Sequence, residues 1–232
     1  MNSKLFGALA AATTLAGIVV TGGTANAASI SYSANSGDFA STDFYDTVLS
    51  IQKFNSALGT LESVTLDITG NIKGDARFES LDAAATIIRT EIGADLFLNQ
   101  GSTNLLTLNL SQSELFNATA FDGQIDFGGT SGGSFDNIMD QRAQTQTLTD
   151  NLGAFIGSGN IDFLLSATAR SSITGSGNLA TIINTLAKGE LTVTYNYSAT
   201  SVPEPSAFLG FGLIAGFGLL SQRKKSRFQI SK

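Results

Sequence analysis

The sequence predicts an all-β domain, an antiparallel β-sandwich of jelly-roll-like or Ig-like type with about nine strands. Two observations lead to this prediction. Apolar and polar residues alternate with a period of two in several segments, and polar, glycine-containing stretches separate these segments. The alternation places one face of a strand in a core and the other in water, and many short strands joined by such turns favour a sandwich or barrel.

Three segments show the alternation most clearly. Residues 61–69 place Val64 and Leu66 on one face of a strand, and the pattern recurs in 106–110 and 191–197. The less regular strands expected are 30–33, 47–54, 76–81, 87–98, 123–127 and 161–171. The turns expected between them include 56–59, 70–74 and 128–134.

Helix has a minor place in this prediction. Residues 139–152 and 179–186 are the two segments that could each form a short helix. No tandem repeat of fixed period is present in the sequence, which argues against a solenoid or a propeller.

The N-terminal residues 1–27 have the layout of a secretory signal peptide. Lys4 precedes an apolar run at 5–20, and an Ala-x-Ala cleavage site follows at Ala25 and Ala27. Signal peptidase is therefore an expected partner, and we expect the mature protein to begin at Ala28.

The C-terminal residues 202–227 form a tail with three parts. Pro203, Glu204 and Pro205 make a rigid joint, an uncharged apolar segment follows at 207–220, and a basic cluster ends the tail at Arg223, Lys224, Lys225 and Arg227. Fourteen helical residues span about 21 Å, which is short for a bilayer but sufficient for insertion with local thinning. The basic cluster should remain cytoplasmic, so the main domain would lie on the outer side of the inner membrane.

This order of joint, apolar segment and basic stop resembles the PEP-CTERM sorting signal of exported bacterial proteins. The resemblance implies recognition and processing at Pro203–Pro205 by the membrane protease exosortase, a transient membrane-anchored intermediate, and a final location at the cell surface or outside the cell. A permanent anchor without processing is an alternative interpretation of the same residues, and a buried core helix is another.

Residues 28–201 remain as one extracytoplasmic domain of 174 residues, enough for a substantial core. This domain contains 7 basic and 18 acidic residues, so its net charge is near −11. So acidic a surface repels nucleic acid and anionic lipid, and we expect no nucleic-acid partner.

The residues that the chain lacks exclude several chemistries. It contains no Cys and no His, which rules out disulfides, thiolate nucleophiles, Ser-His triads and ordinary zinc or copper sites. It also contains no Trp, the best stacking platform for sugars. We therefore expect a protein that is not an enzyme and has no cofactor.

A second resemblance lies within the domain. Residues 54–66 are similar to the opening motif of the choice-of-anchor E family of bacterial surface domains, and 127–132 and 189–197 also fit that pattern. Ser56-Ala57 stands where the family usually has a proline before the Leu-Gly-Thr step. The resemblance implies an exported β domain and no particular chemistry, because the family is defined by its anchoring.

Acidic and glycine-rich segments of the sequence are further candidates for a site. The carboxylate pairs Asp43/Asp46, Asp122/Asp126 and Asp136/Asp140 could in principle support glycoside hydrolysis. In so acidic a domain, solvated loop charge explains these pairs better. The EF-hand pattern is absent, although scattered loop oxygens could form a weak calcium site. The glycine-rich run 128–134 lacks the Lys of a phosphate-binding loop and is expected to be a surface loop.

Three function classes stay open at this point. The first is a non-catalytic surface or matrix protein with a role in adhesion, biofilm or envelope. The second is a carbohydrate-binding module with extracellular polysaccharide as its partner, and the third is a hydrolase that uses carboxylates alone. The Thr-x-Thr steps at Thr192/Thr194 and Thr145/Thr147 suggest a flat ice- or polysaccharide-binding face, but ordinary exposed threonines are expected because the sequence shows no regular array over several strands.

Overall fold

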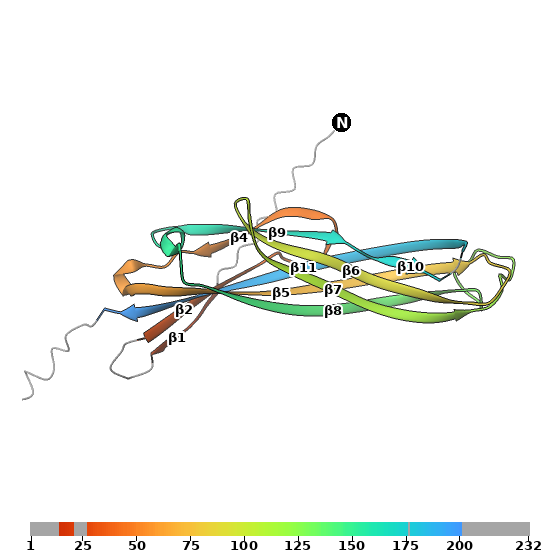
Figure 1. Cartoon of the computed structure of the whole chain (residues 1–232), viewed down its shortest axis with the longest axis horizontal. Helices are drawn as coiled ribbons and strands as arrows, with labels where there is room; N and C mark the ends of the chain where they lie inside the picture. Colours follow the sequence, from red (N-terminus) through yellow and green to blue (C-terminus); the bar gives the residue numbers. More distant parts are fainter. Residues whose placement is uncertain (1–13, 21–26, 176, 201–232) are drawn as a thin grey trace, which may run out of the picture. The chain divides into compact units, whose positions relative to one another are not determined.

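The computed structural model describes residues 14–20, 27–175 and 177–200, which form eleven β-strands and two short 3-10 helices (Figure 1). The chain divides into two units after Ala199, and the described residues except Thr200 belong to the first. The prediction of an all-β domain is confirmed, because two antiparallel sheets enclose a common hydrophobic core.

Sheet A has the strand order β1-β2-β11-β5-β8, and the short β3 also pairs with β11. Its strands are β1 (Thr14–Val20), β2 (Ala27–Asn35), β3 (Ala40–Ser41), β5 (Gly59–Ser80), β8 (Gly132–Leu148) and β11 (Leu179–Ala199). The pair β5–β11 forms its centre and runs from the Leu179–Ser80 pair to the Ala199–Gly59 pair. A strand of 22 residues such as β5 spans roughly 70 Å.

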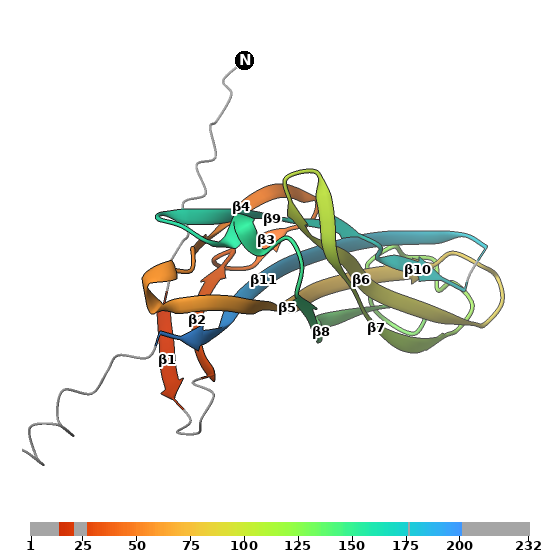
Figure 2. The ribbon, with the colours of Figure 1, turned by 60° about the vertical axis from the view of Figure 1, so that its left-hand side comes forward.

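Sheet B is built around β6. Its strands are β4 (Phe44–Gln52), β6 (Thr86–Gln100), β7 (Thr103–Ala118), β9 (Asn160–Ala169) and β10 (Ser172–Thr174). β7 pairs with β6 along one edge, whereas β9 and then β10 pair with the other edge, and β4 lies beyond β9. In Figure 2 the layer of β4 and β9 lies above the layer of β2, β11 and β5.

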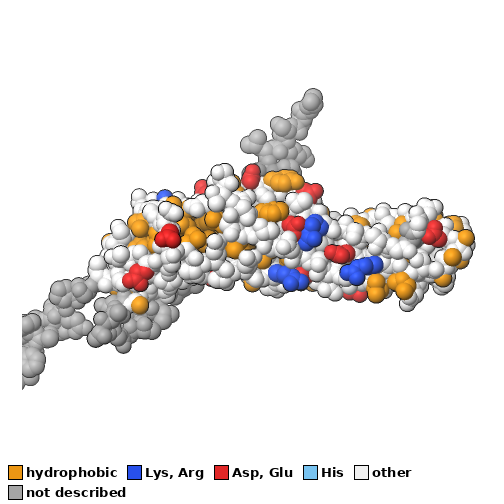
Figure 3. All heavy atoms as spheres, in the orientation of Figure 1, with side chains coloured by type: hydrophobic (Ala, Val, Ile, Leu, Met, Phe, Trp, Pro, Cys, Tyr) orange, Lys and Arg blue, Asp and Glu red, His pale blue; other side chains and the backbone are white. Residues whose placement is uncertain are grey.

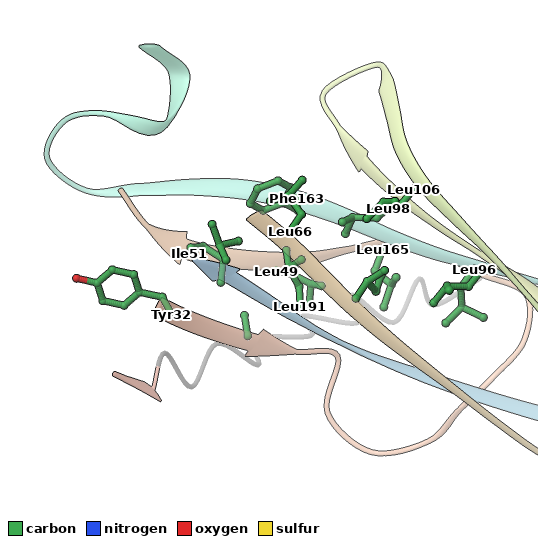
Figure 4. Packing of buried hydrophobic residues seen from close by; sticks show 14 of the residues in the cluster. Tyr32, Leu49, Ile51, Leu66, Leu96, Leu98, Leu106, Phe163, Leu165 and Leu191 are labelled. Carbon is green, nitrogen blue, oxygen red and sulfur yellow. The ribbon is translucent and has the colours of Figure 1, made fainter. Parts of the chain in front are cut away.

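The core lies between the two sheets and confirms the alternation found in the sequence. Val64 and Leu66 of β5 and Leu191 and Val193 of β11 are all fully buried. They meet residues of sheet B such as Leu165, and Figure 4 shows side chains from both layers filling the space between the strands. Each fully buried aliphatic side chain contributes about 1.5–3 kcal/mol to folding.

Residues 70–74, expected to form a turn, instead continue β5 as a regular strand. Gly70 and Gly74 face sheet B, where a Cβ on Gly70 would lie 3.0 Å from Leu96 and Leu108. The glycines therefore permit close approach of the two sheets rather than a change of chain direction. Glycine is favoured both in turns and where two backbones or sheets approach closely. The sequence pattern alone therefore cannot distinguish a turn at 70–74 from a strand that packs closely against another sheet.

The expected strand at 123–127 is also wrong, because this segment is part of a loop. Asp122 Oδ1 accepts a hydrogen bond from the Gln124 N–H, and Asp126 Oδ1 accepts one from the Gly128 N–H. Such Asx turns offer the backbone an alternative to strand pairing.

Neither suggested helix forms. Most of 139–152 belongs to β8, which pairs in register with β5, and the only helical turn there is the short η2 (Leu152–Phe155). Residues 179–186 pair with residues 73–80 of β5 as part of β11. Pairing with a long central strand overrides the weak local preference in both cases. The turn expected at 56–59 does occur, as η1 (Ser56–Leu58).

One strand of sheet A, β1, consists of residues that belong to the expected signal peptide. β1 lies inside the predicted signal peptide and pairs with β2 from the Thr14–Ser33 pair to the Val20–Ala28 pair. Residues 1–13 and 21–26 lie outside the described residues, so removal of the leader stays a prediction.

Candidate functional site

The outer face of sheet A carries polar side chains in rows that cross its strands. Each row joins residues paired in register, so that side chains of neighbouring strands lie side by side. We call this surface the hydroxyl face. Its four rows are Ser29–Asn196–Ser63, Ser31–Thr194–Thr65–Thr147, Ser33–Thr192–Asp67–Thr145 and Asn35–Glu190–Thr69.

Hydrogen bonds between neighbouring strands hold these side chains in place. The two hydroxyl oxygens are 2.8 Å apart for Ser31 and Thr194, 2.7 Å for Ser33 and Thr192, and 3.3 Å for Thr65 and Thr147. The Thr145 hydroxyl donates to Asp67 Oδ1, and the Asn196 amide donates to Ser63 Oγ at 3.1 Å. Cross-strand pairs of this kind each stabilise a sheet by about 0.2–1 kcal/mol relative to alanine.

The hydroxyl face places the threonines, which were expected to be ordinary exposed sheet residues, side by side in one array. Thr192 and Thr194 lie in the same two rows as Thr145 and Thr147, in an array that spans four strands. The sequence places these two Thr-x-Thr steps far apart, and only the shared partner β5 brings them together. The alternation of serine at positions 29, 31 and 33 is the one local signal of this face in β2.

The hydroxyl face ends at Lys188, which lies one row beyond Glu190. Lys188 pairs in register with Asn71, and its Nζ lies 4.7 Å from the centre of the Phe39 ring. A hollow of about 370 Å³ opens beside it, lined by Asn35, Gly37, Asp38, Asn71, Lys188, Gly189 and Glu190. A second hollow of about 490 Å³ shares Asn71 and Lys188 and includes Phe39 in its lining. Charged groups thus gather at this end, whereas the two middle rows contain the single charge of Asp67.

A different polar contact is completely buried. Ser131 donates a 2.6 Å hydrogen bond to Glu79 Oε1, and both residues have no exposed surface. Glu79 Oε2 has no hydrogen-bond partner, and a Cβ on Gly132 would lie 2.1 Å from it. The Ser80 N–H also donates to the Ser131 carbonyl, so these contacts fasten the loop before β8 to β5.

Three carboxylates of the first two pairs, those of Asp43, Asp122 and Asp126, accept hydrogen bonds from the backbone. Asp122 and Asp126 form the Asx turns described above. Asp43 Oδ1 accepts a 2.7 Å hydrogen bond from the Ala169 N–H, which joins the start of β4 to the end of β9. Asp46 adopts a left-handed backbone at a bulge in β4.

The two carboxylates of the third pair, Asp136 and Asp140, lie in different environments. Asp140 accepts from Arg142 Nε at 3.1 Å and from the Ser111 N–H at 3.0 Å, so its carboxylate connects β8 with β7. Asp136 is exposed. None of the contacts described for the three pairs joins two carboxylates at a common point.

The segments that could hold a metal ion or a phosphate group have other structures. Within the part of the chain that the structure describes, no group of three or more acidic side chains is arranged to hold a metal ion. Residues 128–131 form a loop closed by a hydrogen bond from the Gly132 N–H to the Gly128 carbonyl, and β8 begins at Gly132. The glycine-rich run therefore begins as a loop, as expected, and continues into a strand.

The outer face of sheet B has a different character. Ion pairs lie on this face, with Arg170 Nε 2.7 Å from Asp95 and a longer contact between Arg89 and Glu91 within β6. Figure 3 shows charged side chains of both signs over this region. Tyr45 is 66% exposed at the bulge in β4, and is the one tyrosine of the chain that does not face the core. It is the exposed aromatic residue that a sugar-stacking site would use.

Two core tyrosines have altered acidity. The Tyr195 hydroxyl donates to the Gln52 carbonyl at 2.9 Å, and burial raises the pKa of Tyr195 far above its ordinary value of 10.0. Burial and the neighbouring Tyr197 also raise the pKa of Tyr32. Both shifts follow from the cost of placing a phenolate in an apolar core.

The predicted sorting residues fall mostly outside the described residues. This holds for Ala25, for the joint at Pro203, Glu204 and Pro205, for the apolar segment 207–220, and for the basic residues Arg223, Lys224, Lys225 and Arg227. Ala27 and Ala28 begin β2, opposite Ser198 and Tyr197 of β11. The described strands and short 3-10 turns include no helix long and apolar enough to cross a bilayer.

Comparison with known proteins identifies no family. No family model matches the sequence, and no curated protein shows significant similarity to it. Similar solved structures include infectious bursal disease virus of the Gx strain, at 12% identity over 81% of this chain with a TM-score of 0.12. T=1 particles derived from that virus align at 10% identity over 82% of this chain with a TM-score of 0.14. The chain spans about half the length of these viral chains, 48% in each case.

Proposed function

We propose that this chain is an exported protein that acts at the cell surface or in the extracellular matrix, in adhesion, biofilm or envelope structure, without catalytic activity. The observation that carries this proposal is the hydroxyl face. Small-molecule and catalytic sites are usually concave and largely apolar, whereas this surface is a broad polar sheet whose side chains are fixed by cross-strand hydrogen bonds. Such a surface suits contact with an extended partner.

The location outside the cytoplasm that we propose depends on the two ends of the chain. Signal peptidase removes residues 1–27, the tail 202–227 holds the protein transiently in the inner membrane, and exosortase then processes it at Pro203–Pro205. The domain 28–201 is left at the cell surface or outside the cell. We also propose that the two sheets of this domain form a sandwich of jelly-roll-like or Ig-like type.

The non-catalytic part of the proposal is supported by the side chains available. The whole chain lacks His and Cys, so imidazole acid–base catalysis and thiolate nucleophiles have no residue to perform them. Asp43, Asp122, Asp126 and Asp140 each accept hydrogen bonds from the backbone, as structural carboxylates do.

Cell fractionation with mass spectrometry tests the placement. We expect the mature protein outside the cytoplasm, beginning at or near Ala28 and lacking the tail. An intact Met1 on a cytoplasmic protein would contradict the proposal.

Binding to carbohydrate is a second function, and the hydroxyl rows favour it over a purely architectural role. Sugars present many hydroxyl groups, and each can donate to and accept from a serine or threonine.

A further inference from the structure

We propose that the hydroxyl face binds a neutral, extended polysaccharide that lies along the strands of sheet A. This proposal rests on the proposed location of the protein outside the cytoplasm. Three properties of the face support this proposal: its unused hydrogen-bonding capacity, its low charge, and its regular spacing.

The hydrogen-bonding capacity follows from the cross-strand pairs. A hydroxyl group has one donor and two acceptor sites. In the Ser31–Thr194 and Ser33–Thr192 pairs, one hydroxyl uses its donor on the other, so each pair keeps one donor and several acceptors for a ligand. The pairs are already ordered, so binding loses less side-chain entropy than a surface of free side chains would.

The low charge selects a neutral polymer. Asp67 is the one charged residue of the two middle rows, and it already accepts from Thr145. The mature domain carries 18 acidic and 7 basic residues, which repel an anionic polymer. Hydroxyl and amide groups without net charge instead match the hydroxyl groups of a neutral sugar chain.

The spacing favours a chain over a single small molecule. Neighbouring strands are about 4.8 Å apart and successive rows about 6.7 Å, so four rows extend for about 20 Å along β11. The hollow beside Lys188 lies at the end of this length, where Asn35, Asn71 and Glu190 could hold a terminal or branching sugar. An ice lattice repeats identically, but these rows mix Ser, Thr, Asn and Asp side chains of different reach.

A matched pair of double variants tests the proposal. Thr192→Val with Thr194→Val removes two hydroxyl groups and keeps the β-branched shape that a strand favours. The control is Thr107→Val with Thr168→Val, because both residues are half-buried strand threonines, like Thr192 and Thr194, but belong to sheet B. Circular dichroism and thermal unfolding verify that both variants fold.

The binding measurement uses the mature protein purified from producing cells. It is sedimented with cellulose, curdlan and starch as neutral polysaccharides and with alginate beads as an anionic one. We expect retention on at least one neutral polymer, none on alginate, and about a tenfold loss of affinity in the sheet A variant but not in the control.

Other results would overturn the proposal. These are no retention on any of the neutral polymers, equal binding by both variants, loss of binding only on Tyr45→Ala, or a dimer in sedimentation velocity that the sheet A variant dissociates. A protein located outside the cell that fails these tests leaves the proposed function standing. A cytoplasmic protein would instead refute the proposed function itself.

Discussion

Gly70 of β5 and Gly189 of β11 lie directly opposite each other in the central strand pair of sheet A, and leucines of sheet B occupy the space that their missing side chains leave. A Cβ on Gly189 would lie 2.7 Å from Leu165 Cδ2, and one on Gly70 would lie 3.0 Å from Leu96 and from Leu108. This glycine pair brings the two sheets together at the middle of the long strands. It also lies between the outer rows of Thr69–Glu190 and Asn71–Lys188.

We expect Gly189→Ala to destabilise the domain by about 1–3 kcal/mol, because the added methyl group must displace the fully buried Leu165. Gly153→Ala is the control, since a Cβ there meets nothing within 4 Å. Urea unfolding of both variants measures the difference. Equal stability would mean that the sheets do not approach closely at Gly189.

A charge on the core face of a central strand should unfold the domain. Leu66→Asp and Val193→Asp each place an unpaired carboxylate in a fully buried site, at a cost of at least about 3–5 kcal/mol. Asn71→Asp introduces the same group on the outer face of β5, opposite Lys188, and should change stability by less than about 0.5 kcal/mol. Far-UV circular dichroism of residues 28–201 should show β-structure for the parent and the Asn71 variant. A mainly helical spectrum for the parent would contradict the fold.

Tyr195 should make the domain sensitive to alkali. Its pKa is raised in the folded state, so its contribution to stability is complete below its ordinary pKa of 10.0 and is lost as the pH rises above that value. Unfolding free energies from about pH 8 to about pH 11 should therefore fall at the alkaline end. Tyr195→Phe should reduce that fall and cost about 1 kcal/mol at neutral pH, because the hydrogen bond to Gln52 is lost. An unchanged alkaline slope in the variant would assign the effect to other groups.

The tail should be required for maturation. Glu204→Ala should alter the Pro-Glu-Pro motif, and deletion of residues 223–227 should remove the basic cluster. Because processing should require both, each change should leave a larger protein that stays with the membrane fraction. Immunoblots of membrane and extracellular fractions measure both size and location. If mutant and parent proteins share the same mass and the same fraction, the tail is an anchor and no processing occurs.

The sequence predicted the parts of this fold that depend on local alternation. Leu66, Leu108 and Val193 lie in the core as their period-two patterns indicated. The predictions failed where pairing between distant segments decided the structure. Gly70 and Gly74 looked like a turn, and 179–186 could have been a helix, but both segments are held in one long strand pair.

The hydroxyl face could be predicted only in part, for the same reason. The Thr-x-Thr step at Thr192 is visible in the sequence, as is the serine alternation at Ser31 and Ser33. These residues and Thr145 lie on one surface because β5 pairs with β11 along one edge and with β8 along the other. No pattern within a single segment contains that information.

Chemical-shift mapping by NMR can locate the binding surface residue by residue. The labelled mature protein is titrated with soluble oligosaccharides made from whichever neutral polysaccharide retains it. We expect the largest shifts at Ser31, Ser33, Thr192 and Thr194, extending toward Lys188. Shifts confined to the surroundings of Tyr45 on sheet B, or no shifts at all, would contradict this expectation.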